Sequence, residues 1–407
     1  MTRDATTQIS LPVGAASETP LGVSIVICTH NGGKRLPQTL AHLGAQRVPK
    51  EINWEVLLID NASTDDTAEV ALRCWQGTTS ARLRVIHEQR LGLNNARVRG
   101  LAEASQEVVS FVDDDNWVCS EWVSGLSDAM SSSPRLAAIA GLVLPKCEIN
   151  PPPWFDCYKL SYAVFDENEL NKFGAPPTYL YGAGLSIRKA AWNRLVEQGF
   201  RFHVSDRRGA NLDAHGDVEL TLRLQAGGWD LAIDPRLSLE HFLPASRLTW
   251  EYLRRLTRAN AASFVPLEAY FYLPDASAGG RRGWLRRYWL SRAIVAGLRV
   301  FPFLPTLLTA GKPFREGRQE VLEAEQKLGR FYGLLRLRSK YTTIRREAEQ
   351  ARDSINVVRQ MPFSTPAVTS CEISMERIPK TPTPMAKVRT TGSNLGEAYR
   401  PRARSRK

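Results

Sequence analysis

Two common signatures are missing from this chain of 407 residues. Its six cysteines include no Cys-x-x-Cys pair, the spacing that zinc sites and thiol redox sites often use. The first 20 residues also lack the long apolar run of a secretory signal, and we interpret them as a flexible arm. We therefore expect reduced thiols and a cytoplasmic protein.

Long apolar runs are scarce as well, and only residues 288–310 match the roughly 20 residues that cross a bilayer. Two arginines and two prolines interrupt the run: Arg292, Arg299, Pro302 and Pro305. Each arginine near the centre of a span costs about 2.5 to 3.5 kcal/mol. Four more arginines precede it: Arg281, Arg282, Arg286 and Arg287. We expect an interfacial helix on an anionic membrane surface, with an ordinary helix docked on the protein as the alternative.

The larger part of the chain has no excess of positive charge. Residues 1–280 hold 27 Lys and Arg against 32 Asp and Glu, residues 281–340 hold 14 against 4, and residues 341–407 hold 13 against 6. Nucleic-acid-binding proteins more often carry positive charge on a folded recognition surface with aromatic residues for base stacking. We therefore expect no nucleic-acid partner.

Strands and helices alternate through the first 145 residues. Residues 23–29 form the near-continuous apolar run of a buried parallel strand, and residues 54–59, 83–86 and 108–112 form similar runs. Helices are expected between them: one with Leu36, Leu40 and Leu43 at helical spacing, one from a capping box of Asp66 and Glu69, and one over 94–104. This βαβαβαβ order predicts an α/β fold with a parallel sheet and helices on both faces.

The rest of the chain is less regular. Strands are expected at 136–144 and 229–233 and a helix at 217–226, and the glycines of 181–187 indicate either a close backbone approach or a bulge. We divide the chain into an arm (1–20), a main domain (21–260) with halves at 21–145 and 146–260, a basic helical extension (261–344) and a disordered basic tail (345–407).

The most informative stretch is a strand that ends directly in Asp113, Asp114 and Asp115. Open α/β sheets bind ligands at the carboxyl ends of their strands. Three adjacent carboxylates repel one another unless a positive group lies among them, and Mg²⁺ or Mn²⁺ carrying a diphosphate meets that need. The alternative is a solvated acidic turn.

Five motifs in order resemble family 2 glycosyltransferases, the inverting GT-A enzymes that use nucleotide sugars. The motifs lie at residues 23–31, 58–66, 92–100, 111–115 and 216–220, and the resemblance covers about residues 20–260. It implies a GT-A, Rossmann-like, mainly parallel sheet with a helical C-terminal extension. It also implies a nucleotide-sugar donor linked to UDP, GDP or dTDP.

The resemblance also implies roles for individual residues. Those expected to bind the nucleotide sugar are Thr29, Asn31, Asp60, Asn61, Arg97, Asp113 and Asp114. Those expected to bind Mg²⁺ or Mn²⁺ are Asp113 and Asp115, to which we add His241 as a candidate ligand of metal or phosphate. A packed or solvated histidine is the alternative at position 241.

The acceptor hydroxyl needs a base, and Asp217 matches the residue usually assigned to that role. Many relatives have two acids here, whereas this chain has Gly216 before Asp217. Glu219 is a substitute base or a structural partner, and its alternative is an acid that favours the helix dipole.

The sequence therefore predicts a metal-dependent hexosyltransferase of polysaccharide or cell-envelope synthesis. It would move a sugar to a hydroxyl of a glycan or lipid-linked acceptor, either in the cytoplasm or peripherally on the cytoplasmic face of the membrane. Two alternatives stay open. One is a nucleotidyltransferase that uses the same crevice, and the other is a catalytically silent GT-A module that binds glycans or acts as a scaffold.

Overall fold

The computed structural model describes residues 19–76, 81–173, 177–209, 211–271 and 288–353. Residues 1–369 form one compact unit and residues 370–407 a second, and every described residue belongs to the first. Nearly all of the predicted N-terminal arm, and the predicted tail beyond residue 353, lie outside the described residues.

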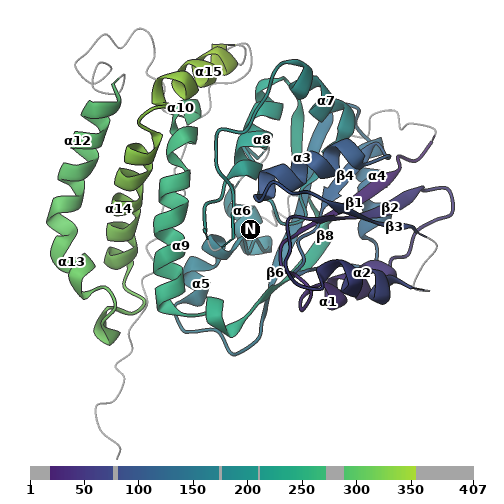
Figure 1. Cartoon of the computed structure of the whole chain (residues 1–407), viewed down its shortest axis with the longest axis horizontal. Helices are drawn as coiled ribbons and strands as arrows, with labels where there is room; N and C mark the ends of the chain where they lie inside the picture. The colour runs from purple at the N-terminus through teal and green to yellow at the C-terminus, as the bar shows by residue number, and fades with distance from the viewer. Residues whose placement is uncertain (1–18, 77–80, 174–176, 210, 272–287, 354–407) are drawn as a thin grey trace, which may run out of the picture. The chain divides into compact units, whose positions relative to one another are not determined.

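An eight-stranded mixed sheet lies at the centre of the unit, with strand order β3-β2-β1-β4-β7-β6-β8-β5 (Figure 1). The strands are β1 Val23–Thr29, β2 Trp54–Asp60, β3 Leu83–His87, β4 Val108–Phe111, β5 Asn116–Val118, β6 Leu136–Cys147, β7 Ser186–Arg188 and β8 Asp230–Leu243. The first four are parallel to their neighbours among themselves. Parallel pairing requires crossover helices, so the predicted βαβαβαβ order is confirmed.

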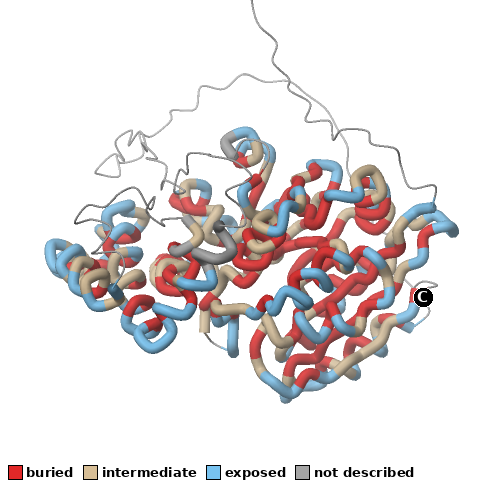
Figure 2. Tube along the Cα trace, turned by 90° about the horizontal axis from the view of Figure 1, so that it is seen from above, coloured by how far each residue is buried: buried red, intermediate tan, exposed pale blue. Residues whose placement is uncertain are grey.

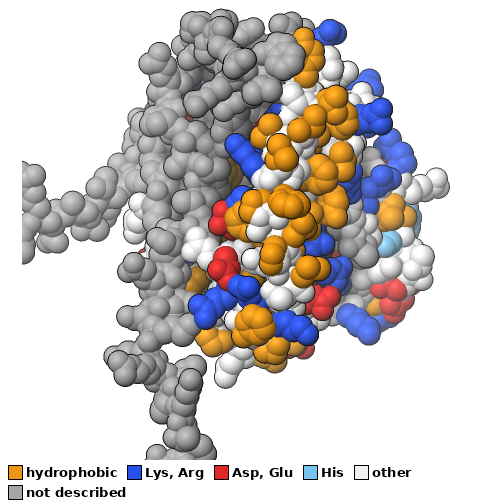
Figure 3. Space-filling view, turned by 90° about the vertical axis from the view of Figure 1, so that its left-hand side faces the viewer, with side chains coloured by type: hydrophobic (Ala, Val, Ile, Leu, Met, Phe, Trp, Pro, Cys, Tyr) orange, Lys and Arg blue, Asp and Glu red, His pale blue; other side chains and the backbone are white. Residues whose placement is uncertain are grey.

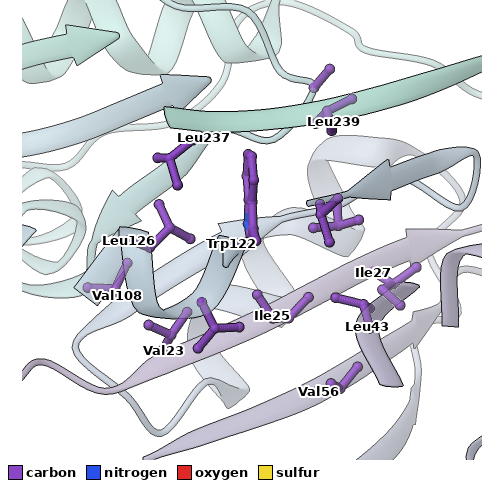
Figure 4. Packing of buried hydrophobic residues seen from close by; sticks show 14 of the residues in the cluster. Val23, Ile25, Ile27, Leu43, Val56, Val108, Trp122, Leu126, Leu237 and Leu239 are labelled. Atoms are coloured by element: carbon purple, nitrogen blue, oxygen red, sulfur yellow. The ribbon is translucent and has the colours of Figure 1, made fainter. Parts of the chain in front are cut away.

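Helices cover both faces of the sheet. On one face lie α1 Leu36–Gly44, α2 Thr67–Trp75 and α4 Trp122–Ser131, and on the other lie α3 Leu93–Glu103, α7 Lys189–Glu197 and α8 Gly216–Ala226 (Figure 1). Two separate buried clusters follow from this layering, one on each face. In the first, Trp122 packs among residues of β1, β4 and β8 (Figure 4). Figure 2 shows the buried strands running through the centre between the exposed turns of the helices.

The predicted capping box of α2 does not form. Asp66 occupies the N-cap position, but its side chain makes no capping hydrogen bond. Asp65 takes over instead, because its carboxylate accepts hydrogen bonds from the backbone and hydroxyl of Thr67. The helix begins where expected, but a different acid satisfies its first turn.

The second half of the sheet is mixed. β7 is antiparallel to β4 and β6, β6 is parallel to β8, and β5 is antiparallel to β8. We expected the last strand to end at Ile233, but β8 continues to Leu243. A register shift opposite Ala140 and Leu142 accommodates Pro235, which has no backbone N–H to donate, and pairing resumes at Ser238.

A helical layer follows the sheet. Its helices are α9 Trp250–Ser263, α10 Glu268–Phe271, α12 Trp289–Val300, α13 Leu304–Thr309, α14 Gln319–Leu337 and α15 Tyr341–Asp353, and the short helices α5 Phe155–Tyr158 and α6 Glu167–Phe173 precede them in the chain. Five single turns complete the described part: η1 Lys159–Tyr162, η2 Ala245–Arg247, η3 Val265–Leu267, η4 Phe301–Phe303 and η5 Pro313–Arg315. Because α15 runs to Asp353, regular structure extends past the boundary predicted at residue 345.

The cysteines differ from expectation at one position. Cys28, Cys74, Cys119 and Cys147 are free thiols, as predicted. Cys157 is disulfide-bonded, so the prediction of six reduced thiols is wrong for this residue. Cys371 lies outside the described residues.

Candidate active site

Three strand ends bring the candidate residues to one edge of the sheet. Thr29 ends β1 and lies in register with Asp60, which ends β2. β4 lies on the other side of β1 and runs directly into the three aspartates. The predicted nucleotide and metal residues therefore meet at the carboxyl edge, where open α/β sheets bind ligands.

The middle aspartate faces away from its two neighbours. Both carboxylate oxygens of Asp114 accept hydrogen bonds from the Arg35 guanidinium, at 2.8 and 2.7 Å, and the Thr29 hydroxyl donates to Oδ2 at 2.5 Å. These partners occupy both Asp114 and Thr29. That Thr29 and Asp114 bind the nucleotide sugar stays a prediction, and in the structure their side chains help to fix the loop after β4.

Asp115 lies between an arginine and a histidine. Its Oδ2 pairs with Arg247 Nη1 at 3.0 Å, and its Oδ1 is 3.7 Å from His241 Nε2. This proximity follows from the sheet, because β5 pairs with β8 in a register that sets Asn116 opposite His241. Burial opposes the charge of Asp115, but neighbouring basic side chains, among them Arg247 and Arg207, outweigh burial and lower the pKa of Asp115.

His241 has the geometry of a metal ligand. Its Nδ1 lies 3.0 Å from the carbonyl oxygen of Tyr162, which fixes Nδ1 as the donor and leaves Nε2 facing Asp115. Burial lowers the pKa of His241, so the imidazole is neutral. A neutral imidazole oriented by a carbonyl is the usual second-shell arrangement of metal-binding histidines.

The described carboxylates and histidines do not supply three grouped ligands for a metal ion. Within the described ranges no three His, Cys, Asp or Glu side chains are grouped to hold an ion. Asp113 turns its Oδ2 toward Asn116 Nδ2 at 3.5 Å, and desolvation and then Asp115 raise the pKa of Asp113 to about 7. The metal set of Asp113, Asp115 and His241 stays a prediction, and the side chains of Asp115 and His241 lie 3.7 Å apart. A pair of protein ligands still fits Mg²⁺ or Mn²⁺, because such ions often keep water and substrate phosphates as further ligands.

Arginines supply part of the positive charge that we assigned to a metal. Arg247 contacts Asp115, and the exposed Arg207 is near enough for its charge to act on Asp113 and Asp115. Repulsion among the acids is thus relieved partly by guanidinium groups. Arg207 makes no ion pair within 4 Å with any residue of the described part, so it is open to an anionic ligand.

Arg97 is buried rather than exposed on its helix. Its side chain pairs with Asp206 at 2.8 Å and lies over the ring of Phe111, 5.9 Å from the centroid. Burial opposes its charge, whereas Asp206 and then Asp217 favour it, and the net effect raises the pKa of Arg97. Arg97 is therefore a fixed cation beneath the site.

Asp217 has the properties of a base. It lies half-buried in the first turn of α8, and its carboxylate makes no hydrogen bond or ion pair with the residues that the structure describes. His215 precedes it in the left-handed region, at φ 83°, a strained conformation for histidine. Gly182 faces it closely, since a Cβ there would lie 2.9 Å from Asp217 Oδ2 and 2.8 Å from Arg97 Nη2. The predicted glycine-permitted close approach is thereby confirmed.

A second acid occupies the space next to Gly216. A Cβ at Gly216 would lie 2.6 Å from Asp206 Oδ2 and 2.4 Å from Asn94 Oδ1. Asp206, which comes from a different loop, therefore borders the volume into which a side chain at position 216 would project.

Glu219 is held in a structural role. It is 0% exposed, and it accepts hydrogen bonds from the backbone N–H groups of His203 and Val204 and contacts His203 Nδ1 at 2.8 Å. A carboxylate with its oxygens occupied in this way has no access to an acceptor hydroxyl. The contacts support the structural alternative and speak against the catalytic assignment of Glu219.

The remaining residues that were predicted to bind the nucleotide fall into two groups. Asn61 is fully used by the protein: its side chain donates to the carbonyls of Glu88 and Arg90 and accepts from Gly92 N at 2.7 Å. Its role as a ligand contact stays a prediction, and in the structure its side chain fixes the loop before α3. Asp60 lies beside His87, and the exposed Asn31 has a left-handed backbone at φ 51°. These two remain candidates for base and ribose contacts.

Comparison with known proteins finds a family similarity. Residues 24–195 match the family model described as glycosyl transferase family 2. This part of the chain is therefore similar to that family. The match ends before α8, so Asp217 lies outside it. The observed mixed α/β sheet with helices on both faces agrees with the GT-A class expected for family 2.

Individual relatives are similar over short stretches. Polypeptide N-acetylgalactosaminyltransferase 5 of Caenorhabditis elegans is 29% identical over 112 residues, which is 27% of this chain and 18% of that protein. Undecaprenyl-phosphate 4-deoxy-4-formamido-L-arabinose transferase of Pseudomonas savastanoi pv. phaseolicola is 29% identical over 118 residues, 29% of this chain and 32% of that one. The chain thus spans less than a third of either relative.

A solved structure is similar over more of the length. Mannosyltransferase PcManGT from Pyrobaculum calidifontis, in complex with GDP-Man and Mn²⁺, aligns with a TM-score of 0.45 and 16% identity. The alignment covers 87% of this chain and 81% of that one.

Sequence reasoning missed several residues of this site. They are Arg35, Tyr162, Asp206, Arg207 and Arg247. Each is distant along the chain from its partner, and none belongs to the five motifs. One signal was available: the absent acid at Gly216 could have directed a search for a nearby aspartate in the preceding loop.

The contact between His203 and two carboxylates predicts a pH-dependent stability. His203 lies between Glu219 and Glu347 of α15, at 2.8 and 2.6 Å, and the hydrogen bond to Glu219 raises the pKa of His203. A raised folded pKa adds stability that is complete below the unfolded value of about 6.5 and is lost as the pH rises through the folded value. His203→Gln should therefore lower the free energy of unfolding by about 1 kcal/mol more at pH 6 than at pH 9.

Urea denaturation of both proteins at the two pH values measures this difference. Glu347→Gln is the matched control with a smaller expected effect, because the Glu347 side chain is 46% exposed and its pair is screened by water. An equal loss of stability at both pH values would contradict a charged His203.

Proposed function

We propose that this protein is an inverting glycosyltransferase that moves a sugar from a nucleoside diphosphate donor to a hydroxyl of a glycan or lipid-linked acceptor. One observation carries the proposal: the pair Asp115 and His241 and the unpaired carboxylate of Asp217 belong to one electrostatic cluster at the carboxyl edge of a domain similar to family 2. The buried Arg97 connects the aspartates that follow β4 with Asp217, because the charges of both Asp113 and Asp217 act on its guanidinium group.

The donor would bind across the edge of the sheet. Asp60 and Asn31 are available for the base and ribose, and Arg207 and Arg247 lie beside the carboxylates where a diphosphate would bind. Guanidinium groups match phosphate oxygens through paired, charged hydrogen bonds. The arginines would therefore hold the diphosphate that departs with the nucleotide.

Asp115 and His241 are the residues that would hold Mg²⁺ or Mn²⁺, with Asp113 as the next carboxylate. Such an ion, when bound, neutralises the diphosphate and stabilises the leaving nucleotide. The neutral Nε2 of His241 and the ionised Asp115 are both in the form that binds a cation.

Asp217 would act as the base in a single displacement. The acceptor oxygen attacks the anomeric carbon on the face opposite the nucleotide, the bond to the diphosphate oxygen breaks with its electron pair, and the configuration inverts. Asp217 accepts the hydroxyl proton as the new bond forms. Asp217 lies in the first turn of α8, where the half-buried side chain is near the loop of Gly182.

We further propose that Asp206 performs the task of the acid absent at Gly216. It is 5% exposed, pairs with Arg97 at 2.8 Å and occupies the volume into which a side chain at 216 would project. Asp206 is a positioning residue in this proposal, since it orients Arg97 rather than touching the substrate.

Similarity and chemistry together support a proposal for the acceptor and for the cellular location of this protein. The name of one relative includes undecaprenyl phosphate, a lipid carrier, and this supports a lipid-linked acceptor for the present chain. We accordingly propose a cytoplasmic enzyme that works next to the membrane.

The metal pair is tested by Asp115→Asn. Thermal shift with UDP-, GDP- and dTDP-sugars, each with and without Mn²⁺, should find one donor class that stabilises the native protein by about 2.7 kcal/mol at 100 times its dissociation constant. The variant should lose the Mn²⁺-dependent part of that shift because one anionic oxygen is gone, while its midpoint without ligand is preserved. Asp230→Asn, at a carboxylate 58% exposed at the start of β8, is the control and should behave as wild type. Unchanged Mn²⁺ dependence in a donor-binding Asp115→Asn would reject the assignment.

The base is tested by Asp217→Asn. The amide keeps the size of the side chain but takes no proton, so kcat should fall by about 10²-fold or more with little change in donor affinity. Glu219→Gln should instead lower thermal stability and leave kcat of the folded fraction nearly unchanged. Steady-state transfer and donor titration on both variants decide between them. A larger loss of kcat for folded Glu219→Gln would show that the base has been misassigned.

The role of Asp206 is tested by moving the acid. Asp206→Ala should lower kcat by about tenfold or more through the loss of Arg97 orientation, and Gly216→Asp alone should be defective because its side chain would overlap Asp206. The double variant Asp206→Ala with Gly216→Asp should recover part of kcat, since Asn94 Oδ1 has no hydrogen-bond partner in the described part and can give way. A purely structural Asp206 would give no recovery of kcat in the double variant, whatever its stability.

A further inference from the structure

The outer face of α12 and α13 is apolar, and no other described part of the chain covers it. Leu290, Ile294, Leu298 and Phe301 recur every three or four residues and are 58%, 55%, 69% and 72% exposed, and Leu308 on α13 is 84% exposed. Figure 3 shows hydrophobic side chains gathered over the side of the molecule that α12 and α13 form. A contiguous apolar stripe on a helix surface marks a site of interaction, because water is a poor solvent for it.

The opposite face of the same helix is docked on the protein. Ala293, Ala296 and Val300 are buried against α14, and the Trp289 indole donates to the carbonyl of Leu334 at 2.5 Å. One face of α12 is therefore fixed and the other is left free. The exposed stripe is not the unpacked side of a loosely attached helix.

This packing determines how the segment can meet a bilayer. Residues Trp289–Thr309 are long and apolar enough to be a candidate span. Arg292 nevertheless faces the protein, where it pairs with the buried Glu268 and contacts the Tyr341 hydroxyl at 3.0 Å. Crossing a bilayer would break these charged contacts in hydrocarbon. The segment is suited to lie on a membrane rather than to cross it.

Positive charge accompanies the stripe. Arg299 and Lys312 are exposed next to its apolar residues, and the exposed Arg338 lies over the Trp289 ring at 5.5 Å from the centroid. Residues 288–340 hold 10 Lys and Arg against 4 Asp and Glu. Figure 3 shows Lys and Arg side chains around the apolar area. The combination of an apolar stripe and a basic surround matches an anionic bilayer surface.

We propose that the outer face of α12 and α13 docks the enzyme on an anionic lipid bilayer, with the helices parallel to the surface. A second copy of the chain is a poorer occupant, because it would bring the same positive charges together. The docked layer is continuous with the site: α9 packs on α14 and begins just after Arg247, which contacts Asp115. Vesicle binding needs neither donor nor metal, so its failure would leave the proposed transferase activity untouched.

Sedimentation of the full chain with phosphatidylcholine vesicles, with and without phosphatidylglycerol, tests the proposal. The wild type should bind the anionic vesicles at low salt and be partly released at high salt. The double variant Leu298→Glu with Phe301→Glu should lower the ratio of bound to free protein by about tenfold or more. A control pair, Leu72→Glu with Val196→Glu, replaces residues 50% and 49% exposed on α2 and α7 and should bind as wild type.

Both double variants change exposed side chains, so thermal unfolding and donor binding should stay at wild-type values and confirm folding. A further double variant, Arg299→Glu with Lys312→Glu, reverses positive charge next to the stripe. It should weaken binding to the anionic vesicles and reduce the salt dependence of that binding. Absence of vesicle binding, equal loss in the control pair, or association that resists salt and requires detergent would each overturn the proposal. So would a wild-type dimer that Leu298→Glu with Phe301→Glu converts to a monomer in light scattering, because the face would then join two copies.

Discussion

Several carboxylates must lie close together at the edge of this sheet, and the rest of the site depends on how their repulsion is balanced. Three buried aspartates are each held by an arginine from a different part of the chain: Asp114 by Arg35 at the N-cap of α1, Asp115 by Arg247 of η2, and Asp206 by Arg97 of α3. Guanidinium groups suit this task because they stay charged when buried and present a planar fork to a carboxylate. The sheet edge, two crossover helices and the helical layer are thereby tied to one cluster of charge.

The same pairing sorts the aspartates by role. Both oxygens of Asp114 accept hydrogen bonds from protein groups, so its carboxylate is held in place by Arg35 and Thr29. Asp217 differs, because its carboxylate makes no hydrogen bond or ion pair with the residues that the structure describes. The buried Arg97 lies near it and is itself paired with Asp206. A carboxylate whose oxygens are uncovered can accept a proton from a bound hydroxyl.

The sequence was sufficient for the parallel half of the fold and insufficient for the contacts within the site. Buried strands such as residues 23–29 have continuous apolar runs, and this local pattern predicted their position and pairing. The strand predicted at residues 229–233 was too short. Pro235 normally interrupts a strand, but in β8 a bulge accommodates it and the strand continues beyond it. The partners Arg247 and Asp115 are 132 residues apart, and no local pattern encodes such a pair. Glu219 fitted a catalytic role by its position after Asp217, but tertiary contacts with His203 and Val204 determine what it does.

The helical layer connects the apolar face to the chemistry through rigid contacts. Glu325 of α14 is fully buried and binds Arg254 and Arg258 of α9, so α14 and α9 are fixed to each other by paired charges. Removing one partner of such a buried pair leaves an uncompensated charge, which makes sliding between the two helices costly. α12 is fixed to α14, and α9 follows directly on the turn that carries Arg247. The orientation of the apolar face relative to Asp115 is therefore set by the fold. An enzyme held on a bilayer by that face would present the same side of its site to every acceptor embedded in the membrane, and diffusion of the acceptor would be confined to the plane of the lipid.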